Sequence, residues 1–213
     1  MLRNPSLPAS PVVVVNFPHV SDTGGRTKLE SNRPRWHNSS EVDAVVDVLR
    51  RLKPGATPAS IAILSPYKAQ VDRIQERISS LKRSDLAHLS GFKSVRQDGG
   101  FVGTVDSFQG SEADIVILSL VRNNPKTGVG AVGFLRDRRR MNVALSRAKS
   151  QLFIIGSLAF LREAVRGVNP DGDKHDLSFL TSVTDAISEL SAETRNGLPL
   201  ASIITPQQLR AQP

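Results

Sequence analysis

The fold of this chain is constrained most by two long apolar runs. They are ADIVILSLV at residues 113–121 and SQLFIIG at residues 150–156. Side chains alternate between the two faces of a strand, so a strand with one face in water shows a polar residue at every second position. Neither run alternates in this way, which is typical of strands covered on both faces. The sequence therefore predicts a sheet with helices on both sides.

Helical patterns alternate with further strand candidates along the chain. Shorter apolar runs lie at residues 11–17 (PVVVVNF), 61–66 (IAILSP) and 101–105 (FVGTV). Asn38 or Ser39 can cap a helix whose apolar positions repeat at helical spacing, and a second amphipathic helix is predicted from Lys68. Residues 83–100 are expected to be irregular. The order predicts an α/β fold with a mostly parallel sheet, in which ligands bind at the carboxyl ends of the strands.

Composition excludes several classes of protein. The chain has no cysteine and its four histidines are scattered, so we expect no disulfide and no metal site. No apolar run approaches the roughly 20 residues of a membrane span, and the N-terminus lacks a signal-peptide pattern. We therefore expect an intracellular protein, in the cytoplasm or nucleus, without membrane contact.

Positive charge is concentrated in one segment. The formal net charge is +8, and six basic residues stand against a single acid, Asp137, between residues 134 and 150. A helix is predicted from Arg138 to Lys149, and the seven-residue spacing of Arg140 and Arg147 places both on one flank of it. A solvated basic face is one interpretation. The excess of arginine, whose planar fork binds phosphate in two places, favours a phosphate-binding surface.

A polar segment precedes the first long apolar run. Asp106, Gln109 and Glu112 lie in GTVDSFQGSE, directly in front of the strand predicted from residue 113. An ordinary turn explains such a segment, because Asp, Ser and Gly dominate turns. A functional loop beside the sheet is the alternative. A nuclease metal cluster of Asp106, Glu112 and Asp114 is disfavoured because Asp114 opens the predicted strand, and a Ser-His-Asp hydrolase is disfavoured because no G-x-S-x-G motif occurs. Trp36 is expected to be a packing residue.

Three segments resemble known motifs. ILSPYKAQ, VGTVDSFQGSEADIVILSLVR and DRRRMNVALSRAK resemble, in order, motifs IV, V and VI of superfamily 1 helicases of the up-frameshift and Dna-two type. The resemblance covers about residues 12–161. It implies a second RecA-like domain, with three layers, that closes on a first RecA-like domain. ATP and magnesium would lie between the two domains, and single-stranded RNA or DNA would cross them.

The resemblance also implies roles for individual residues. Arg147 would be the arginine finger on the γ-phosphate, with Glu112 and Arg140 as further catalytic contacts. Gln109 and Gly110 would belong to the nucleotide-side loop. Contacts to the nucleic-acid backbone would come from Ser65, Pro66, Tyr67 and Thr104.

Two elements of an ATPase are missing from the sequence. No G-x-x-x-x-G-K-[ST] loop and no strand ending in Asp-Glu occur, and the DTGGRTK segment at residues 22–28 lacks the required order. We therefore expect an isolated chain that is inactive: the C-terminal motor half of a helicase, as a fragment or a separate piece. The alternative is a catalytically inactive module that binds nucleic acid or a partner.

The expected domain organisation has three parts. Residues 1–10 form an N-terminal tail, residues 11–168 form the second RecA-like domain, and residues 169–213 form a C-terminal extension. The extension is acidic and is assigned only a helix near residues 177–190.

Overall fold

A computed structural model describes residues 6–20, 36–166 and 176–211. The DTGGRTK segment lies outside the described residues. Within them, seven strands form one sheet in the order β3-β2-β5-β6-β1-β9, with β4 also paired to β2. These strands are β1 (Val12–Asn16), β2 (Ser60–Ser65), β3 (Lys93–Ser94), β4 (Val102–Thr104), β5 (Ala113–Ser119), β6 (Ala148–Gly156) and β9 (Ala201–Ile204). Every pairing in the sheet is parallel, which confirms the expected fold class.

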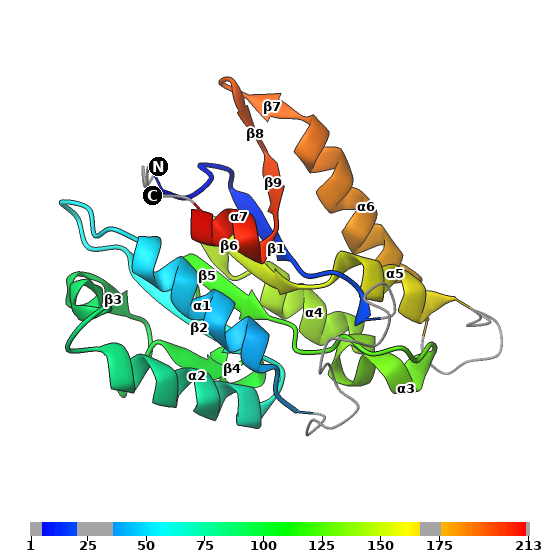
Figure 1. The fold of residues 1–213 in the computed structure, drawn as a ribbon, viewed down its shortest axis with the longest axis horizontal. Coiled ribbons are helices and arrows are strands. Elements are labelled where there is room, and N and C mark those ends of the chain that lie inside the picture. The colour runs from blue at the N-terminus through cyan, green and yellow to red at the C-terminus, as the bar shows by residue number, and fades with distance from the viewer. Residues whose placement is uncertain (1–5, 21–35, 167–175, 212–213) are drawn as a thin grey trace.

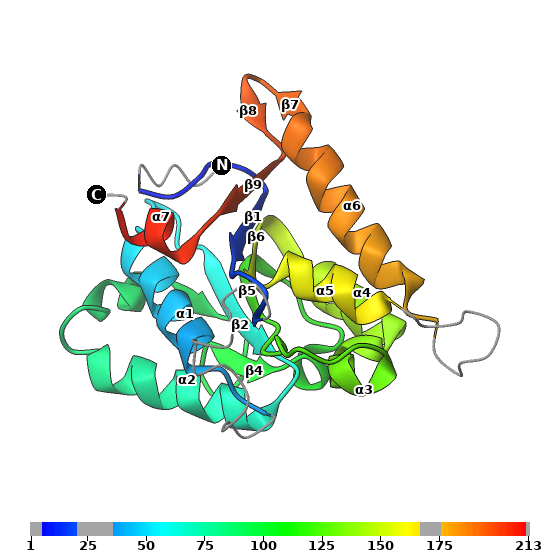
Figure 2. The ribbon, with the colours of Figure 1, turned by 45° about the vertical axis from the view of Figure 1, so that its right-hand side comes forward.

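Helices cover both faces of the sheet (Figures 1 and 2). One face is covered by α1 (Ser39–Arg51), α2 (Lys68–Leu81) and α7 (Pro206–Ala211), and the other by α3 (Val129–Val132), α4 (Arg138–Leu145), α5 (Leu158–Val165) and α6 (Ser178–Ala192). Short 3-10 helices are η2 (Ala87–Gly91), η3 (Asp106–Phe108) and η4 (Gly133–Arg136). The three layers explain why the long apolar runs do not alternate.

The central strands divide their side chains between two hydrophobic cores. On β5, Ile115 and Ile117 pack with α1 and α2, whereas Val116 and Leu118 pack with α4 and α5. All four side chains are essentially inaccessible to water. Burial of such side chains on both faces stabilises the domain by roughly 1.5–3 kcal/mol for each large aliphatic side chain.

The helix starts follow the predicted signals. Asn38 caps α1, and its side-chain oxygen accepts hydrogen bonds from the backbone N–H groups of Ser40 and Glu41. The α2 helix begins at Lys68, as expected. No helix within the described ranges is long and apolar enough to cross a membrane.

Two segments hold more regular structure than the sequence indicated. Residues 83–100 contain η2 and β3, and β3 joins the sheet beside the first half of β2. The segment beyond residue 168 holds the expected helix as α6, but it also forms a hairpin of β7 (Thr194–Arg195) and β8 (Leu198–Pro199), then β9 and α7. Figures 1 and 2 show the hairpin standing apart from the sheet, whereas β9 lies along β1.

Candidate functional site

Arg140 and Arg147 lie at opposite ends of α4. Arg140 is in the first turn, and the helix ends at Leu145, so Arg147 belongs to the link into β6. The expectation of a helix to Lys149, with both arginines on one flank, is therefore wrong. The cause is the sheet: Ala148 already pairs with Ala113 of β5, and extended backbone is needed there.

Arg147 is held beside the segment that enters β5. Its Nε donates to the carbonyl of Val143 at 2.9 Å, its Nη2 to the Oγ of Ser146 at 2.9 Å, and its Nη1 to the carbonyl of Ser111 at 3.4 Å. The backbone N–H of Ala113 donates to the carbonyl of Arg147 at 3.1 Å. Arg147 and the Ser111–Ala113 segment are thus one unit at the amino ends of β5 and β6.

Glu112 is exposed in the same unit. Its carboxylate lies 3.8 Å from the Nζ of Lys149, a distance at which an exposed pair contributes little to stability. Because Ser111 and Ala113, the two neighbours of Glu112, both form hydrogen bonds with Arg147, the structure brings positions 112 and 147 together.

Arg140 lies at the N-terminal end of α4, where acidic and aromatic side chains contact its guanidinium. Its Nε lies 3.1 Å from a carboxylate oxygen of Asp106 and 3.6 Å from one of Asp137, and its guanidinium carbon lies 5.0 Å from the ring centre of Phe134. Asp137 also caps α4, accepting hydrogen bonds from the N–H groups of Arg139 and Arg140. The guanidinium of Arg140 is therefore exposed to solvent, while its contacts with Asp106, Asp137 and Phe134 fix its orientation.

Gln109 and Gly110 lie in the exposed loop between η3 and β5. Gln109 lines a hollow of about 490 Å³ together with Asp106, Arg139 and Arg140. Gly110 has φ of 82°, a left-handed conformation that glycine adopts without strain. The structure thus brings Gln109 near Arg140, and the same loop runs on to Glu112 and Arg147.

Ser65 and Thr104 end adjacent strands at the carboxyl edge of the sheet. They are register partners of β2 and β4. The Oγ of Ser65 is fully buried and forms no hydrogen bond among the described residues. Thr104 accepts a hydrogen bond from the N–H of Ser107 on its Oγ1. Pro66, which follows Ser65, is partly buried.

Tyr67 is a buried residue at the same edge. Its hydroxyl accepts a hydrogen bond from the N–H of Phe134 at 3.1 Å. That hydroxyl packs on Gly133, where a Cβ would lie 2.5 Å from it, and Gly133 also has φ of 57°. Only glycine fits this contact without displacement, so Tyr67 and the turn before η4 are locked together.

The sequence did not indicate the surroundings of Trp36. Trp36 is 51% exposed and so does not lie in the core, but it does pack on Tyr67, whose ring centre lies 5.3 Å from its own. Trp36, Phe134 and the arginines of α4 line a hollow of about 920 Å³. The sequence signal for this exposed aromatic side chain was a single tryptophan in a polar segment, separated by one residue from the helix cap Asn38.

Asp114 has a structural role. Its carboxylate accepts hydrogen bonds from the N–H of Ser60 at 2.8 Å and from the Oγ of Ser60 at 2.7 Å, which lower its pKa. Among the described residues, no group of three His, Asp or Glu side chains could hold a metal ion. Asp114 instead links the beginnings of β2 and β5.

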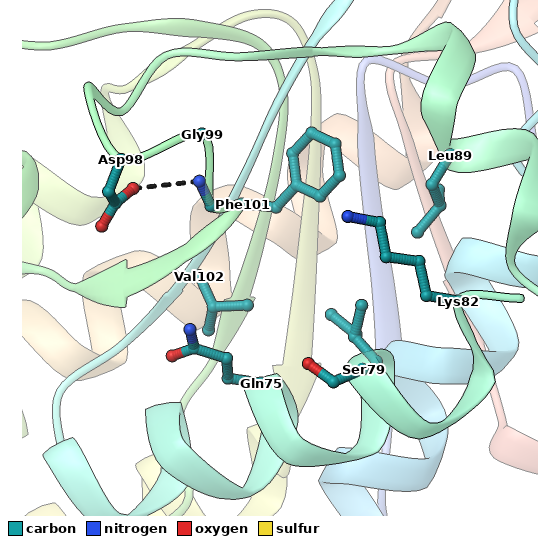
Figure 3. A pocket seen from close by; sticks show the side chains of 10 residues that line it. Gln75, Ser79, Lys82, Leu89, Asp98, Gly99, Phe101 and Val102 are labelled. Carbon is teal, nitrogen blue, oxygen red and sulfur yellow. Dashed lines mark hydrogen bonds between the residues drawn. The ribbon is translucent and has the colours of Figure 1, made fainter.

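A smaller hollow lies away from all of these residues. It measures about 210 Å³ and lies between α2 and the segment before β4 (Figure 3). Asp98 at its rim accepts hydrogen bonds from Arg96 and from the N–H of Gly100, which lower its pKa to about 2. Figure 3 shows Lys82 reaching from the end of α2 toward Phe101.

A family model described as an AAA domain (AAA_12) matches residues 2–159, most of the described sheet and both ends of α4. The chain belongs to this family. As expected, it belongs with the C-terminal region of superfamily 1 helicases of the up-frameshift type.

Several curated proteins are similar to this AAA domain. The Danio rerio protein mov-10-B.1 is 34% identical over 150 residues, which are 65% of this chain and 14% of that protein. DNA polymerase alpha-associated DNA helicase A of Saccharomyces cerevisiae is 37% identical over 128 residues (59% and 16%), and Regulator of nonsense transcripts 1 of Dictyostelium discoideum is 36% identical over 138 residues (64% and 10%). The chain thus spans a small part of each relative.

Proposed function

We propose that this chain is the C-terminal motor half of an ATP-dependent RNA or DNA helicase. It supplies an arginine finger, Arg147, and contacts to single-stranded nucleic acid, while a first RecA-like domain supplies the groups that hold ATP and magnesium. The names of the relatives and the order of the motifs support this assignment.

The observation that carries the proposal is the environment of Arg147. The three hydrogen-bond acceptors around its guanidinium are two backbone carbonyls and one hydroxyl. No carboxylate of a described residue forms an ion pair with it within 4.0 Å. Its charge is therefore not neutralised, and it can exchange neutral acceptors for phosphate oxygens, which bind a guanidinium more strongly.

Two side chains on the loop beside Arg147 suit contacts to a bound nucleotide. Glu112 offers a carboxylate beside Arg147, and Gln109 offers an amide from the same loop. ATP supplies the γ-phosphoryl group that is transferred, and negative charge spreads over its oxygens during transfer. Arg147 would stabilise that charge, with Arg140 as a second cation once its pairing with Asp106 opens. The described residues offer no carboxylate cluster for magnesium, so that ion would be held by the first domain.

Arg147→Ala tests the finger in a fusion of this chain to a competent first RecA-like domain. An arginine delivered across a closing interface contributes about 10³ to 10⁵ in rate, so nucleic-acid-stimulated ATP hydrolysis should fall by that factor. Nucleotide affinity should change less than about tenfold, because the finger acts in the transition state. Arg147→Lys should restore little activity, since an ammonium lacks the planar fork.

Arg77→Ala is the matched control. Arg77 is an exposed arginine on α2, on the opposite face of the sheet from α4. If both variants lowered turnover equally, Arg147 would not be a finger. The chain alone should hydrolyse no ATP above background, and robust turnover by it would contradict the division of labour between two domains.

A catalytically inactive binding module remains the second candidate function, because the sequence lacks a phosphate-binding loop. Binding of single-stranded nucleic acid that weakens steeply with salt is expected of both candidates, since arginines release condensed counterions. Only the assignment as a motor half predicts that Arg147 accelerates ATP hydrolysis in the fusion.

A further inference from the structure

Four side chains form a continuous ladder beside α4. The ring centre of Tyr67 lies 5.3 Å from that of Trp36 and 6.3 Å from that of Phe134. The guanidinium carbon of Arg140 in turn lies 5.0 Å from the ring centre of Phe134. Trp36 is the outer end of this ladder and is half exposed, whereas Tyr67 is buried.

The ladder is rigid at its centre. The Tyr67 hydroxyl is fixed by the N–H of Phe134 and by the close approach of Gly133. The ring of Trp36 thus packs on a side chain that these two contacts hold in place, and about half of Trp36 is left open to solvent. An aromatic surface presented in this way can stack a planar ligand at little cost in side-chain entropy.

Trp36 lines a hollow that holds more arginines than carboxylates. Arg136, Arg138, Arg139 and Arg140 line it, and its acidic residues are Asp137 and Asp176. Of the four arginines, only Arg140 forms an ion pair within the part of the chain that the structure describes. The hollow therefore keeps an excess of positive charge beside a stacking surface.

We infer that Trp36 stacks against a base of single-stranded nucleic acid while the arginines of residues 136–140 bind the flanking phosphates. This inference rests on the proposed function and adds to it a base contact. Stacking on an aromatic ring tolerates any base, because every base has a flat π face. The ladder also continues the carboxyl edge at Ser65 and Thr104, where backbone contacts are proposed.

The chemistry of the hollow favours a strand over an acidic peptide. Carboxylates would use the arginines but would leave the face of Trp36 without a planar partner. A nucleotide strand offers both a flat ring and a phosphate within one repeating unit. Arginine suits that phosphate, because two of its N–H groups can bind one phosphate together.

Trp36 is the single tryptophan of the chain, so its fluorescence reports directly on stacking. Titration of the full chain with a short oligothymidylate should quench the emission and saturate. An abasic strand of equal length should bind more weakly and quench little. Trp36→Ala should weaken oligothymidylate binding, measured by anisotropy of a labelled strand, by about 5- to 150-fold, the range for one stacked base. Trp36→Phe should retain most of the affinity.

Leu198→Ala is the control, because Leu198 is another exposed apolar side chain and lies on the separate hairpin. The urea unfolding midpoint of Trp36→Phe should match that of the unaltered chain, and circular dichroism should show that Trp36→Ala is folded under the conditions of the binding assay. Strand binding without quenching, and with unchanged affinity in Trp36→Ala, would overturn the stacking while leaving the proposed function intact. Absence of any strand binding at low salt would overturn both. Equal quenching by polyglutamate would show that the hollow binds acidic chains.

Discussion

Glu41 is buried at the first turn of α1 and holds the chain where β5 ends. One carboxyl oxygen accepts hydrogen bonds from the Oγ of Ser119 at 2.6 Å and the N–H of Val121 at 2.8 Å, and the other accepts from the amide of Asn38 at 3.2 Å. Val121 has φ of 72°, which is strained for a β-branched residue and costs on the order of 1–3 kcal/mol. The buried hydrogen bonds to Glu41 offset that strain.

Glu41→Gln should lower the free energy of unfolding by about 1–3 kcal/mol. Both carboxyl oxygens accept hydrogen bonds, so an amide would place its NH₂ group against a donor whichever way it is turned. Urea unfolding followed by circular dichroism measures the change. Glu76→Gln, on the exposed face of α2, should stay within about 0.5 kcal/mol of the unaltered chain. Equal effects of the two substitutions would show that the Glu41 contacts contribute nothing.

At the scale of one element, α4 connects the two halves of the proposed site. It is only eight residues long and its first turn is fixed by the Asp137 cap. Its basic N-terminal end lies beside the ladder of Trp36, and its C-terminal end leads to Arg147. The position of both functional ends therefore depends on one short helix.

Asp137→Asn should keep the cap of α4 but remove the negative charge of Asp137. Asparagine caps as well as aspartate, so the unfolding free energy should change by less than about 0.5 kcal/mol, whereas Asp137→Ala should cost about 1 kcal/mol. Removing a carboxylate from the arginine-lined hollow should tighten single-stranded nucleic-acid binding about two- to fivefold at low salt, the range for one exposed pair. Anisotropy titrations measure this, with Asp72→Asn on α2 as the control. Weaker binding by Asp137→Asn would argue against phosphate in the hollow.

The end of α4 also shows how far the sequence could predict this structure. Met141, Ala144 and Ala148 repeat at helical spacing, so the pattern predicted a helix that continued past Arg147. Met141 and Ala144 do face the core. Ala148 belongs to β6, because pairing with β5 is a long-range contact that no local pattern contains. Local signals were sufficient for α1 and α2, whose caps and apolar stripes are self-contained.

The sequence likewise predicted the parts of the candidate site that lie within one motif, but not the contacts between distant segments. The motifs located Arg140, Arg147 and the loop around Gln109, since each is a continuous stretch of sequence. They could not show that Trp36 rests on Tyr67, because that contact joins segments 31 residues apart in the numbering. The 920 Å³ hollow likewise combines Trp36 with α4 and Asp176.

At the scale of the whole molecule, the sheet is completed by its last strand. β9 pairs in parallel with β1, and β1 pairs on its other side with β6. α7 then packs Leu209 into the core beneath α1, and Arg210 lies 3.0 Å from the carboxylate of Asp47. The four-residue strand was missed in the sequence because its run, ASII, is short and is followed directly by the polar, proline-containing stretch TPQQ.

Removal of residues 201–213 should therefore expose β1 as an apolar edge of the sheet. β1 consists of four valines and an asparagine, and without β9 its outer N–H and C=O groups would lack partners. Unpaired strand edges with β-branched side chains promote association between chains. The shortened chain should elute as oligomers in size-exclusion chromatography and unfold at lower urea concentration, since it also loses the buried Leu209. Removal of residues 212–213 alone should change neither property. A monomeric shortened chain with an unchanged midpoint would show that β9 is dispensable and that the domain ends before it.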